Sequence, residues 1–422
     1  MTPAHPRSVG IIGLGYVGLP LAIAFAEAGV DVVGVDASED VVTGLADGRS
    51  HIQDVSDARL GNAAGHLRAT RDAGGLRDVD AVLICVPTPL NANREPDLSA
   101  LRSAAETVAS VLRAGQLVVL ESTTYPGTTR EQLVPILERG SGLRAGEDFH
   151  VAYSPERIDP GRTDFTLANT PKTVGGLTPA CSAVARDVYA AVCGDVRIVS
   201  SADVAEFSKL LENIFRSVNI ALVNELAMLS QRMGLDIREV VDAAATKPYG
   251  FMRFDPGPGM GGHCLPVDPF YLTWRAREFD CATEFVELAG KINQEMPHYC
   301  VNRAERALNE HSRSVRGSRI AMLGVAYKPE IGDTRESPAL KMISLLQDLG
   351  ADVCYHDPFV DELPTLGLRG VDLAEAVDDA DLVIVMTPHR HLDYDRIAAE
   401  ARCVLDLRGV VGSETGGTVY SL

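Results

Sequence analysis

The stretch Ser8-Val9-Gly10-Ile11-Ile12-Gly13-Leu14-Gly15-Tyr16-Val17-Gly18 decides the fold of the N-terminal part of the chain. A β-branched run leads directly into a Gly-x-Gly-x-x-Gly motif, and an apolar helical pattern follows at 19–28. A second strand pattern, 30–35, ends in Asp36. Glycines in this context allow a tight turn and let a pyrophosphate approach a helix N-terminus. The segment therefore predicts a Rossmann dinucleotide site that uses Gly13, Gly15 and Gly18.

Asp36 indicates which dinucleotide binds. At the end of the second strand it would accept hydrogen bonds from the adenosine ribose and repel a 2′-phosphate. No arginine stands beside it. The sequence therefore favours NAD over NADP.

The strand-and-turn rhythm continues along the first part of the chain and restarts near Ser318. Polar turns follow the strand-like runs 81–86 and 116–120, and they contain Thr88 and Thr123. Ligands of doubly wound sheets bind outside the carboxyl ends of strands, so both threonines are candidates to line the cofactor. The run 350–357 repeats the strand-to-acid pattern without a second Gly-x-Gly-x-x-Gly motif. We expect this part to bind something other than NAD.

A long helical pattern over 202–232, without proline or glycine, separates these two α/β regions. Lys209, Asn213 and Arg216 fall on one face of it. This stripe is either a solvated surface or a set of groups suited to a sugar hydroxyl and a diphosphate. A further helical stretch covers roughly 270–312.

The fold class predicted is α/β, with two Rossmann-like doubly wound domains joined by a central helical domain that has a long helix. The expected domain bounds are 1–200 for NAD binding, 201–312 for the central helices and 313–422 for the second Rossmann-like domain.

One cysteine stands in the glycine- and proline-rich loop 256–269. The following Leu-Pro-Val-Asp-Pro is compatible with a first helical turn, which would place Cys264 near a helix N-terminus and favour its thiolate. The residue is either a covalent catalyst or a small buried cysteine in a glycine-rich turn.

Bulk composition excludes several classes of function. The chain has 422 residues and a formal net charge of −19, which argues against nucleic acid as a partner. Its eight cysteines are scattered without a Cys-x-x-Cys pair, as expected for free thiols in a reducing cytoplasm. The apolar N-terminal stretch is interrupted by glycines and lacks a basic run, so we expect no targeting segment and no membrane partner. No second Cys/His pair accompanies His263-Cys264, so we expect no metal.

Several motifs stand in order along nearly the whole chain. They are Gly13-x-Gly15-Tyr16-Val17-Gly18, Ser122-Thr123, Ser154-Pro155-Glu156-Arg157, Lys209-x-x-x-Asn213, Gly261-Gly262-His263-Cys264-x-x-x-Asp268 and Asp333-Thr334-Arg335-Glu336-Ser337. Together they resemble the UDP-glucose/GDP-mannose dehydrogenase family of nucleotide-sugar dehydrogenases. The resemblance implies an NAD domain, a dimerising helical middle and a UDP-binding C-terminal domain. It also implies oxidation of a sugar C6 alcohol to a carboxylate by two NAD⁺, through a thiohemiacetal and a thioester on Cys264.

The resemblance also implies roles for individual residues. Lys209 would transfer protons and steady an oxyanion, Asn213 and Asp268 would hold the water or the oxygen, and Glu156 with Thr123 would organise hydrolysis. The implied cofactor positions are Tyr16, Val17, Asp36, Thr88, Thr123 and Arg335, the last reaching over from a partner subunit of a homodimer. The implied substrate positions are Arg157, Ile158, Lys209, Asn213, Arg216, Arg253, Gly261, Tyr327, Lys328 and Arg408.

The sugar is indicated by the residues after Glu156. Glu156-Arg157-x-x-Pro160-Gly161 is similar to the UDP-N-acetylhexosamine branch and differs from the Glu-Phe-Leu of the UDP-glucose branch. Within that branch, the runs 247–251, 270–274 and 287–290 look most like the UDP-N-acetylglucosamine 6-dehydrogenases. We therefore expect UDP-N-acetylglucosamine, with UDP-N-acetylmannosamine and UDP-glucose as alternatives. A two-electron β-hydroxyacid dehydrogenase has no use for Cys264 or for a third domain. A non-catalytic nucleotide-sugar binding protein remains the alternative from another class.

Overall fold

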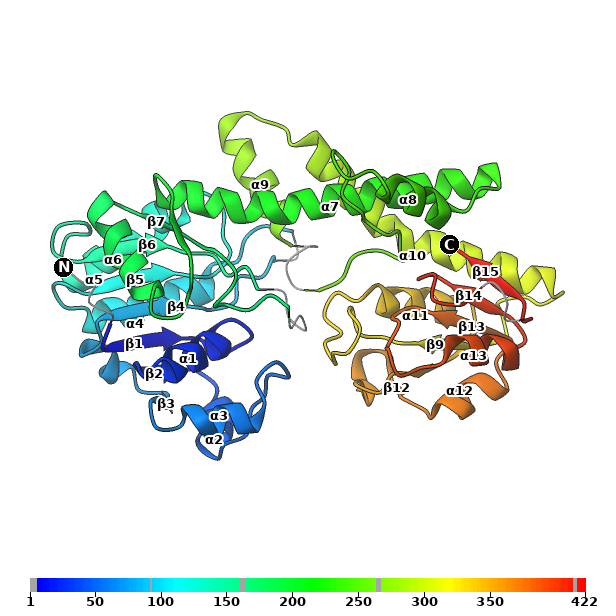
Figure 1. Cartoon of the computed structure of the whole chain (residues 1–422), viewed down its shortest axis with the longest axis horizontal. Coiled ribbons are helices and arrows are strands. Elements are labelled where there is room, and N and C mark those ends of the chain that lie inside the picture. Colours follow the sequence, from blue (N-terminus) through cyan, green and yellow to red (C-terminus); the bar gives the residue numbers. More distant parts are fainter. Residues whose placement is uncertain (1–5, 92, 159–163, 263–266, 413–415) are drawn as a thin grey trace. The chain divides into compact units, whose positions relative to one another are not determined.

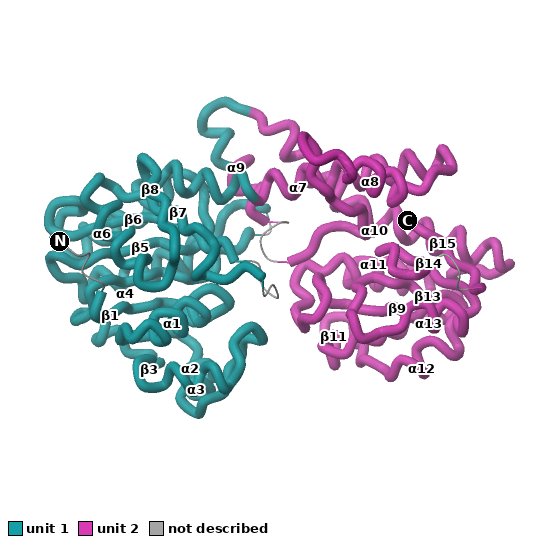
Figure 2. Tube along the Cα trace, viewed as in Figure 1, with its two compact units in different colours: residues 1–212, 274–281 teal, residues 213–273, 282–422 magenta. Residues whose placement is uncertain are grey.

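A computed structural model describes residues 6–91, 93–158, 164–262, 267–412 and 416–422. The chain forms two compact units, Met1–Glu212 with Trp274–Cys281 and Asn213–Thr273 with Ala282–Leu422 (Figure 2). Helix α7 (Ala202–Met233) begins in the first unit and ends in the second (Figure 1). The three domain bounds expected from the sequence stay a prediction.

The first unit is built on one eight-stranded sheet in the order β3-β2-β1-β4-β5-β6-β7-β8. Its strands are β1 (Ser8–Ile12), β2 (Asp31–Val35), β3 (Leu67–Thr70), β4 (Ala81–Ile84), β5 (Leu117–Leu120), β6 (His150–Tyr153), β7 (Lys172–Gly176) and β8 (Val196–Ile198). From β3 to β6 every pair is parallel, and β7 runs antiparallel to β6. The order reverses at β1, so the polar turns after β1, β4 and β5 lie at the edge where doubly wound sheets bind ligands.

Helices and short turns connect these strands. They are α1 (Gly18–Glu27), α2 (Glu39–Ala46), α3 (Asp57–Ala63), η1 (Ala73–Arg77), α4 (Ser99–Val111), η2 (Thr129–Leu133), α5 (Val134–Ser141) and α6 (Pro179–Tyr189). The core of this unit joins apolar residues of α1 to those of β1 and β4, including Leu19, Ile23, Ile11 and Leu83. The fully apolar strands are buried, as the sequence of a parallel sheet requires.

The second unit contains most of the central helices. After α7 come α8 (Ile237–Ala245), α9 (Asp268–Ala276), η3 (Arg277–Phe279) and α10 (Glu284–Glu310). The helix expected over 270–312 is therefore divided, because Asp280 adopts a left-handed conformation (φ 53°) that ends the helical run. Pro297 lies inside α10.

The second sheet of five parallel strands has the order β10-β9-β13-β14-β15. Its strands are β9 (Arg319–Leu323), β10 (Asp352–His356), β13 (Leu382–Val385), β14 (Val404–Asp406) and β15 (Val419–Ser421). The remaining elements are α11 (Pro338–Asp348), β11 (Glu362–Leu363), η4 (Pro364–Leu366), β12 (Leu368–Arg369), α12 (Leu373–Asp378) and α13 (Tyr394–Glu400). The sequence thus predicted both α/β sheets and the helical segment between them.

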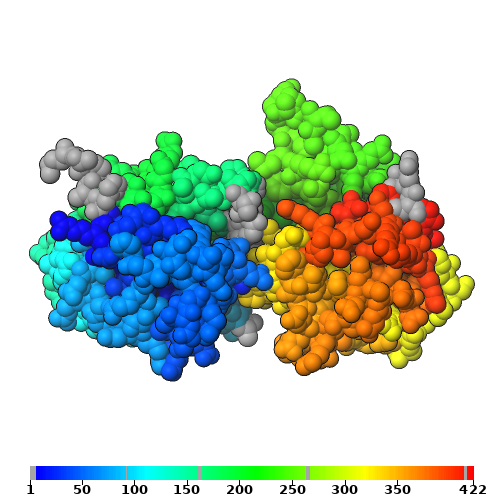
Figure 3. Space-filling view, turned by 60° about the horizontal axis from the view of Figure 1, so that its bottom comes forward, coloured from blue at the N-terminus to red at the C-terminus, as the bar shows by residue number. Residues whose placement is uncertain are grey.

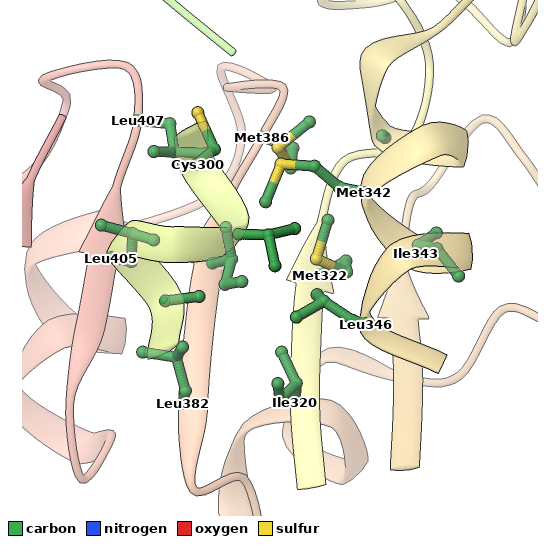
Figure 4. Close-up of a cluster of buried hydrophobic side chains, with 14 of the residues drawn as sticks. Cys300, Ile320, Met322, Met342, Ile343, Leu346, Leu382, Met386, Leu405 and Leu407 are labelled. Atoms are coloured by element: carbon green, nitrogen blue, oxygen red, sulfur yellow. The ribbon is translucent and has the colours of Figure 1, made fainter. Parts of the chain in front are cut away.

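One core joins the central helices to the second sheet. Cys300 of α10 lies beside Leu405 and Leu407, while Met342 and Leu346 of α11 face Met322 and Ile320 of β9 (Figure 4). The space-filling view shows the C-terminal segments, orange to red, gathered over one side of this unit (Figure 3). Helix α10 therefore shares its core with the second sheet, although it precedes that sheet in the sequence.

Among the described residues, no helix combines the length and the apolar composition that crossing a bilayer requires.

The second turn of α7 is tied to the loop after β5 by a buried carboxylate. Glu206 is fully buried. It accepts hydrogen bonds from the backbone N–H of Gly127 (2.6 Å), the backbone N–H of Thr129 (2.8 Å) and the Thr129 hydroxyl (2.7 Å). Three donors depend on this side chain, so its removal would leave them buried and unpaired.

We predict that Glu206→Ala lowers the free energy of unfolding of the first unit by about 3 kcal/mol, because each buried donor that loses its acceptor costs about 1 kcal/mol or more. Urea denaturation followed by circular dichroism measures the change. Glu106→Ala is the matched control, since Glu106 is exposed on α4 of the same unit. Equal unfolding midpoints for the two variants would contradict the assignment.

Candidate active site

The glycine motif after β1 forms a tight turn with an open face. Gly13 has φ +88°, and a Cβ on Gly18 would lie 1.8 Å from the Gly13 carbonyl oxygen. Apart from Gly15 and its two chain neighbours, no described residue has a heavy atom within 4 Å of the place where a Cβ on Gly15 would stand. The turn thus excludes side chains on its inner side and leaves space at Gly15. These features fit a pyrophosphate that approaches the backbone at the start of α1.

Asp36 sits where the sequence predicted, directly after β2. Its carboxylate accepts hydrogen bonds from Leu14 N–H (2.8 Å) and Ser38 N–H (2.9 Å). A carboxylate has about four acceptor positions, so it keeps capacity for ribose hydroxyls. Tyr16, 39 % exposed, and Val17 lie in the same turn, at the entry to α1. The cradle therefore fits the adenosine half of NAD.

Thr88 and Thr123 lie together in the turns after β4 and β5. The Thr88 hydroxyl donates to the Thr123 carbonyl (2.7 Å), and the Ser122 hydroxyl donates to the Val86 carbonyl (2.7 Å). These bonds join the two turns beside the glycine motif of β1. Both predicted threonines are thus at the switch point of the sheet.

Glu156 follows β6 and is held by its own backbone. One carboxylate oxygen accepts from the N–H groups of Arg157 (2.8 Å) and Ile158 (2.6 Å). Burial alone would raise the pKa of Glu156. The Lys172 ammonium, the Ile158 N–H and the Lys209 ammonium outweigh burial and hold that pKa below its usual value. Glu156 therefore remains an anion throughout the neutral range.

Arg157 is committed to protein partners. Its guanidinium pairs with Glu212 (2.8 Å) and donates to the Pro171 carbonyl (2.6 Å), and its side chain is 28 % exposed. Lys209 is buried on α7, one turn before Asn213. The first unit thus gathers Thr123, Glu156 and Lys209 at or near the carboxyl edge of its sheet.

Asn213 and Asp268 form a buried pair in the second unit. The Asn213 amide donates to Asp268 Oδ2 at 2.5 Å, and the two side chains are 5 % and 3 % exposed. Asp268 is the first residue of α9, where the helix dipole favours a negative charge. The structure thus brings together two of the residues that the sequence singled out.

The glycine loop 256–262 is anchored to two helices by side-chain amides. The Gly257 N–H donates to Asn224 of α7 (2.9 Å), Asn224 donates to Asn293 of α10 (3.0 Å), and Asn293 donates to the Ser217 carbonyl (3.1 Å). Pro297 has no N–H to donate to the Asn293 carbonyl. A Cβ on Gly259 would lie 3.1 Å from that carbonyl oxygen. The loop thus packs where the hydrogen-bond ladder of α10 is interrupted.

The end of the same loop contacts the turn after β9. Gly262, with φ +86°, donates its N–H to the Arg335 carbonyl (3.1 Å). A Cβ on Gly261 would lie 2.7 Å from the Cβ of Tyr327. Only glycine fits these positions, and Gly261, Tyr327 and Arg335 are consequently neighbours. Lys328 directly follows Tyr327 in the turn.

Arg408 reaches the start of the loop. Its Nη1 would lie 2.7 Å from a Cβ on Gly257, and its Nε donates to the Met386 carbonyl (2.6 Å). Burial lowers the pKa of Arg408 to about 10, which leaves the guanidinium charged at neutral pH. A cation therefore lies beside the glycine loop.

Three of the predicted arginines lie at or near the surface. Arg216 is exposed on α7. Arg253 pairs with Asp242 (2.5 Å) and Asp255 (2.9 Å). Arg335 makes a two-point pair with Asp333. The described single chain thus holds Arg253 and Arg335 in local ion pairs.

Cys264 lies outside the described residues. Within the described part of the chain, no group of three His, Cys, Asp or Glu side chains is placed to hold a metal ion.

The second α/β sheet repeats the strand-to-acid pattern with a different result. Asp357, after β10, accepts from the N–H groups of Val325 (2.7 Å) and Ala326 (3.1 Å) and faces the buried ring of His389 (3.2 Å). Its carboxylate is 0 % exposed. The acid that could reach a ribose in the first sheet is closed off in the second.

Comparison with known proteins assigns all three parts of the chain. Residues 7–193 match the NAD binding domain of the UDP-glucose/GDP-mannose dehydrogenase family, 203–295 its central domain and 321–413 its UDP binding domain. The chain belongs to this family. It is therefore an NAD-dependent nucleotide-sugar dehydrogenase, and the predicted family and cofactor are confirmed.

Individual relatives of this dehydrogenase are named for different sugars. The chain is 36 % identical over 422 residues to a UDP-N-acetyl-D-mannosamine dehydrogenase of Pyrococcus horikoshii, covering 98 % of each chain. It is 37 % identical over 353 residues to a UDP-N-acetyl-D-glucosamine 6-dehydrogenase of Pseudomonas aeruginosa, covering 83 % of each. The solved structure of the UDP-D-ManNAc dehydrogenase of P. horikoshii matches with a TM-score of 0.90 at 35 % identity over 98 % of each chain. Relatives of nearly equal identity to this chain are thus named for two different UDP-N-acetylhexosamines.

Sequence reasoning missed four buried polar residues of this dehydrogenase: Glu121, Lys172, Asn224 and Asn293. Glu121 directly precedes the Ser122-Thr123 motif, and Asn224 follows Asn213 on α7. Lys172 and Asn293 stand in no motif, so only their burial marks them.

We predict that Asn224→Ala loosens the glycine loop, because the Gly257 N–H loses its buried acceptor. Hydrogen exchange of the 250–262 peptide should accelerate at least tenfold. Asn219→Ala is the control, since the Asn219 amide donates to the Phe215 carbonyl of its own helix. Unchanged exchange in Asn224→Ala would show that the amide chain does not hold the loop.

Proposed function

We propose that this dehydrogenase oxidises the C6 alcohol of a UDP-N-acetylhexosamine, in the first place UDP-N-acetylglucosamine, to the uronate in two steps of two electrons each. The observation that carries this proposal is the buried Asn213–Asp268 pair, one helical turn beyond Lys209. An amide, a carboxylate and an ammonium at this spacing suit an oxygen that first loses a proton and later bears negative charge.

Bound NAD⁺ would supply the hydride acceptor for each of the two oxidations. Gly13, Gly15, Gly18 and Asp36 would hold its adenosine and pyrophosphate. Thr88 and Thr123 would line the site at the switch point.

Residues of this chain would transfer protons and hold the oxidised sugar carbon covalently until hydrolysis. The C6 hydroxyl would lose its proton to a water held by Asn213 and Asp268, while the Lys209 ammonium would assist this proton transfer and stabilise the oxyanion of the tetrahedral intermediates. The Cys264 thiolate would add to the aldehyde to form a thiohemiacetal, which the second oxidation converts to a thioester. Water, held by Thr123, Asp268 and the anionic Glu156, would then release the uronate and regenerate the thiol, with Glu156 as the candidate base.

The substrate would lie against both glycine-rich and cationic groups. Tyr327 lies against Gly261 at the end of the loop, with Lys328 next to it in the sequence, and Arg408 lies against Gly257 at the start of the loop. Together these groups would suit a uridine diphosphate. Arg157 and Ile158 follow Glu156 and would face the sugar substituents. Arg216 is exposed and Arg253 is held in two ion pairs, so both side chains would have to change conformation to contact a phosphate. The N-acetylhexosamine preference is supported by the Glu156-Arg157 pattern and by the names of the relatives.

We predict two NADH per sugar and the highest kcat/KM with UDP-N-acetylglucosamine. Discrimination of about tenfold or more is expected, because a site that hydrogen-bonds an acetamido group rejects sugars without it. NADH absorbance with limiting UDP-GlcNAc, UDP-ManNAc, UDP-glucose and GDP-mannose measures both quantities. One NADH per sugar would contradict the thioester route, and no NADH with any sugar would favour a non-catalytic binding protein.

Two cysteine variants serve as controls for this count. Cys264→Ser should stop after at most one NADH per sugar or accumulate a stable ester. Cys281→Ser should retain two, because Cys281 is an exposed cysteine away from the glycine loop in sequence. Equal stoichiometry in both variants would remove Cys264 from the mechanism.

The protein is also proposed to be a homodimer that associates through α7. Large apolar side chains recur at spacings of three, four or seven residues on one face of this helix, and all are more than 40 % exposed in the single chain. They are Phe207, Leu211, Phe215, Leu222, Leu226, Leu229 and Met233. A stripe of this length is typical of a helix that packs against a second copy.

We predict that Leu226→Glu converts the dimer to a monomer, because it buries a charge in the centre of this stripe. Light scattering after gel filtration should then give one chain of 45.1 kDa instead of two. Gln231→Glu adds the same charge on α7 outside the stripe and should leave the dimer intact. A wild-type protein that elutes as a monomer would refute the proposal.

A further inference from the structure

A buried lysine that the proposed chemistry does not use lies beside Glu156. Lys172 is the first residue of β7 and is 2 % exposed. Its ammonium is 2.7 Å from Glu121 Oε2 and 3.4 Å from Glu156 Oε2. Glu121 itself is 1 % exposed, at the carboxyl end of β5. One buried cation thus links the ends of two parallel strands at the edge that holds the candidate site.

The two carboxylates differ in access to solvent. The Glu121 side chain is fully buried and also accepts a hydrogen bond from the Tyr189 hydroxyl, while the Glu156 side chain is 16 % exposed. One oxygen of Glu156 takes two backbone N–H groups, and the other faces Lys172. A single counter-ion would satisfy a purely structural lysine. The second, partly exposed carboxylate is the one expected at the reaction.

We propose that Lys172 is a positioning residue of this dehydrogenase: it fixes the charge and the orientation of the Glu156 carboxylate, and Glu121 in turn fixes Lys172. This inference rests on the role proposed for Glu156 in thioester hydrolysis. Lys172 touches neither the substrate nor the cofactor in this scheme and acts only through Glu156.

The charged groups around Lys172 are consistent with Glu121 fixing Lys172 and Lys172 fixing Glu156. Burial raises the pKa of Glu121, although Lys172 opposes the shift. The Lys172 ammonium of β7 and the Lys209 ammonium of α7 both lower the pKa of Glu156. Lys172 also interacts with the Glu121 carboxylate. Burial raises the pKa of the Cys85 and Cys193 thiols, so both stay neutral. Removal of the Lys172 charge therefore leaves Glu156 with Glu121 and fewer cations, and its pKa must rise.

Lys172→Met tests the proposal, because methionine keeps most of the stem and lacks the charge. We expect kcat at pH 6 to fall at least tenfold and the acidic limb of the kcat profile to move up by one pH unit or more. The KM values for NAD and the sugar should stay within twofold. Lys341→Met, an exposed lysine on α11, should keep the wild-type profile. A wild-type pH profile in Lys172→Met would overturn the proposal.

Glu121→Gln gives a second, opposite readout that remains usable if Lys172→Met fails to fold. This variant removes the Glu121 charge, so Lys172 would pair with Glu156 alone. The pKa of Glu156 should then stay the same or fall, and the acidic limb of the kcat profile should stay in place or move to lower pH. A purely structural network predicts the same loss of kcat, without a change of profile, in both variants, and that result would overturn the proposal.

Glu156→Gln separates this inference from the proposed function. A large fall in kcat for Glu156→Gln, together with an unshifted profile in the Lys172 and Glu121 variants, would retain the function and remove the positioning role. Full turnover in Glu156→Gln would instead remove the role of Glu156 itself. Rescue of the acidic limb by Lys172→Arg, which restores the cation, would support the proposal.

Discussion

The chain of hydrogen bonds from Gly257 through Asn224 and Asn293 to the Ser217 carbonyl holds the glycine loop against α7 and α10. Buried amides must find partners, and here each amide satisfies the next. Glycines of this loop have no side chains with which to pack, so these polar contacts replace the hydrophobic ones that usually fix a loop. Cys264, the candidate nucleophile, follows this loop in the sequence. The position of the loop depends on side chains that are far away in the sequence.

The same requirement explains the other buried polar groups. Glu206 satisfies three donors of the loop after β5, and Lys172 lies between two carboxylates at the ends of β5 and β6. In each case a charged side chain inside a unit holds a turn at the carboxyl edge of a parallel sheet. Such edges bind ligands because their backbone groups are unpaired, and additional side chains are needed to keep the turns in place.

The two α/β sheets share a strand-to-acid sequence pattern but differ in whether the acid is accessible to a ligand. Both sheets have an acid after a strand, at Asp36 and at Asp357, and both acids accept backbone N–H groups of the neighbouring turn. The second acid also faces the buried His389 ring and has no exposed surface. The missing glycine motif in the C-terminal half indicated this difference, but the sequence did not identify His389 as the residue that closes the site.

The strand, turn and helix periodicities, the glycine motif and the order of the family motifs could be predicted from the sequence, because they depend on neighbours within a few positions. The sequence also singled out Asn213 and Asp268, which the structure pairs across 55 positions. It could not give the ion pairs of Arg157 and Arg253 or the buried partners of Lys172 and Asn293. Only the tertiary structure decides which distant carboxylate or amide a buried polar side chain meets, since desolvation makes that partner obligatory and local pattern does not specify it.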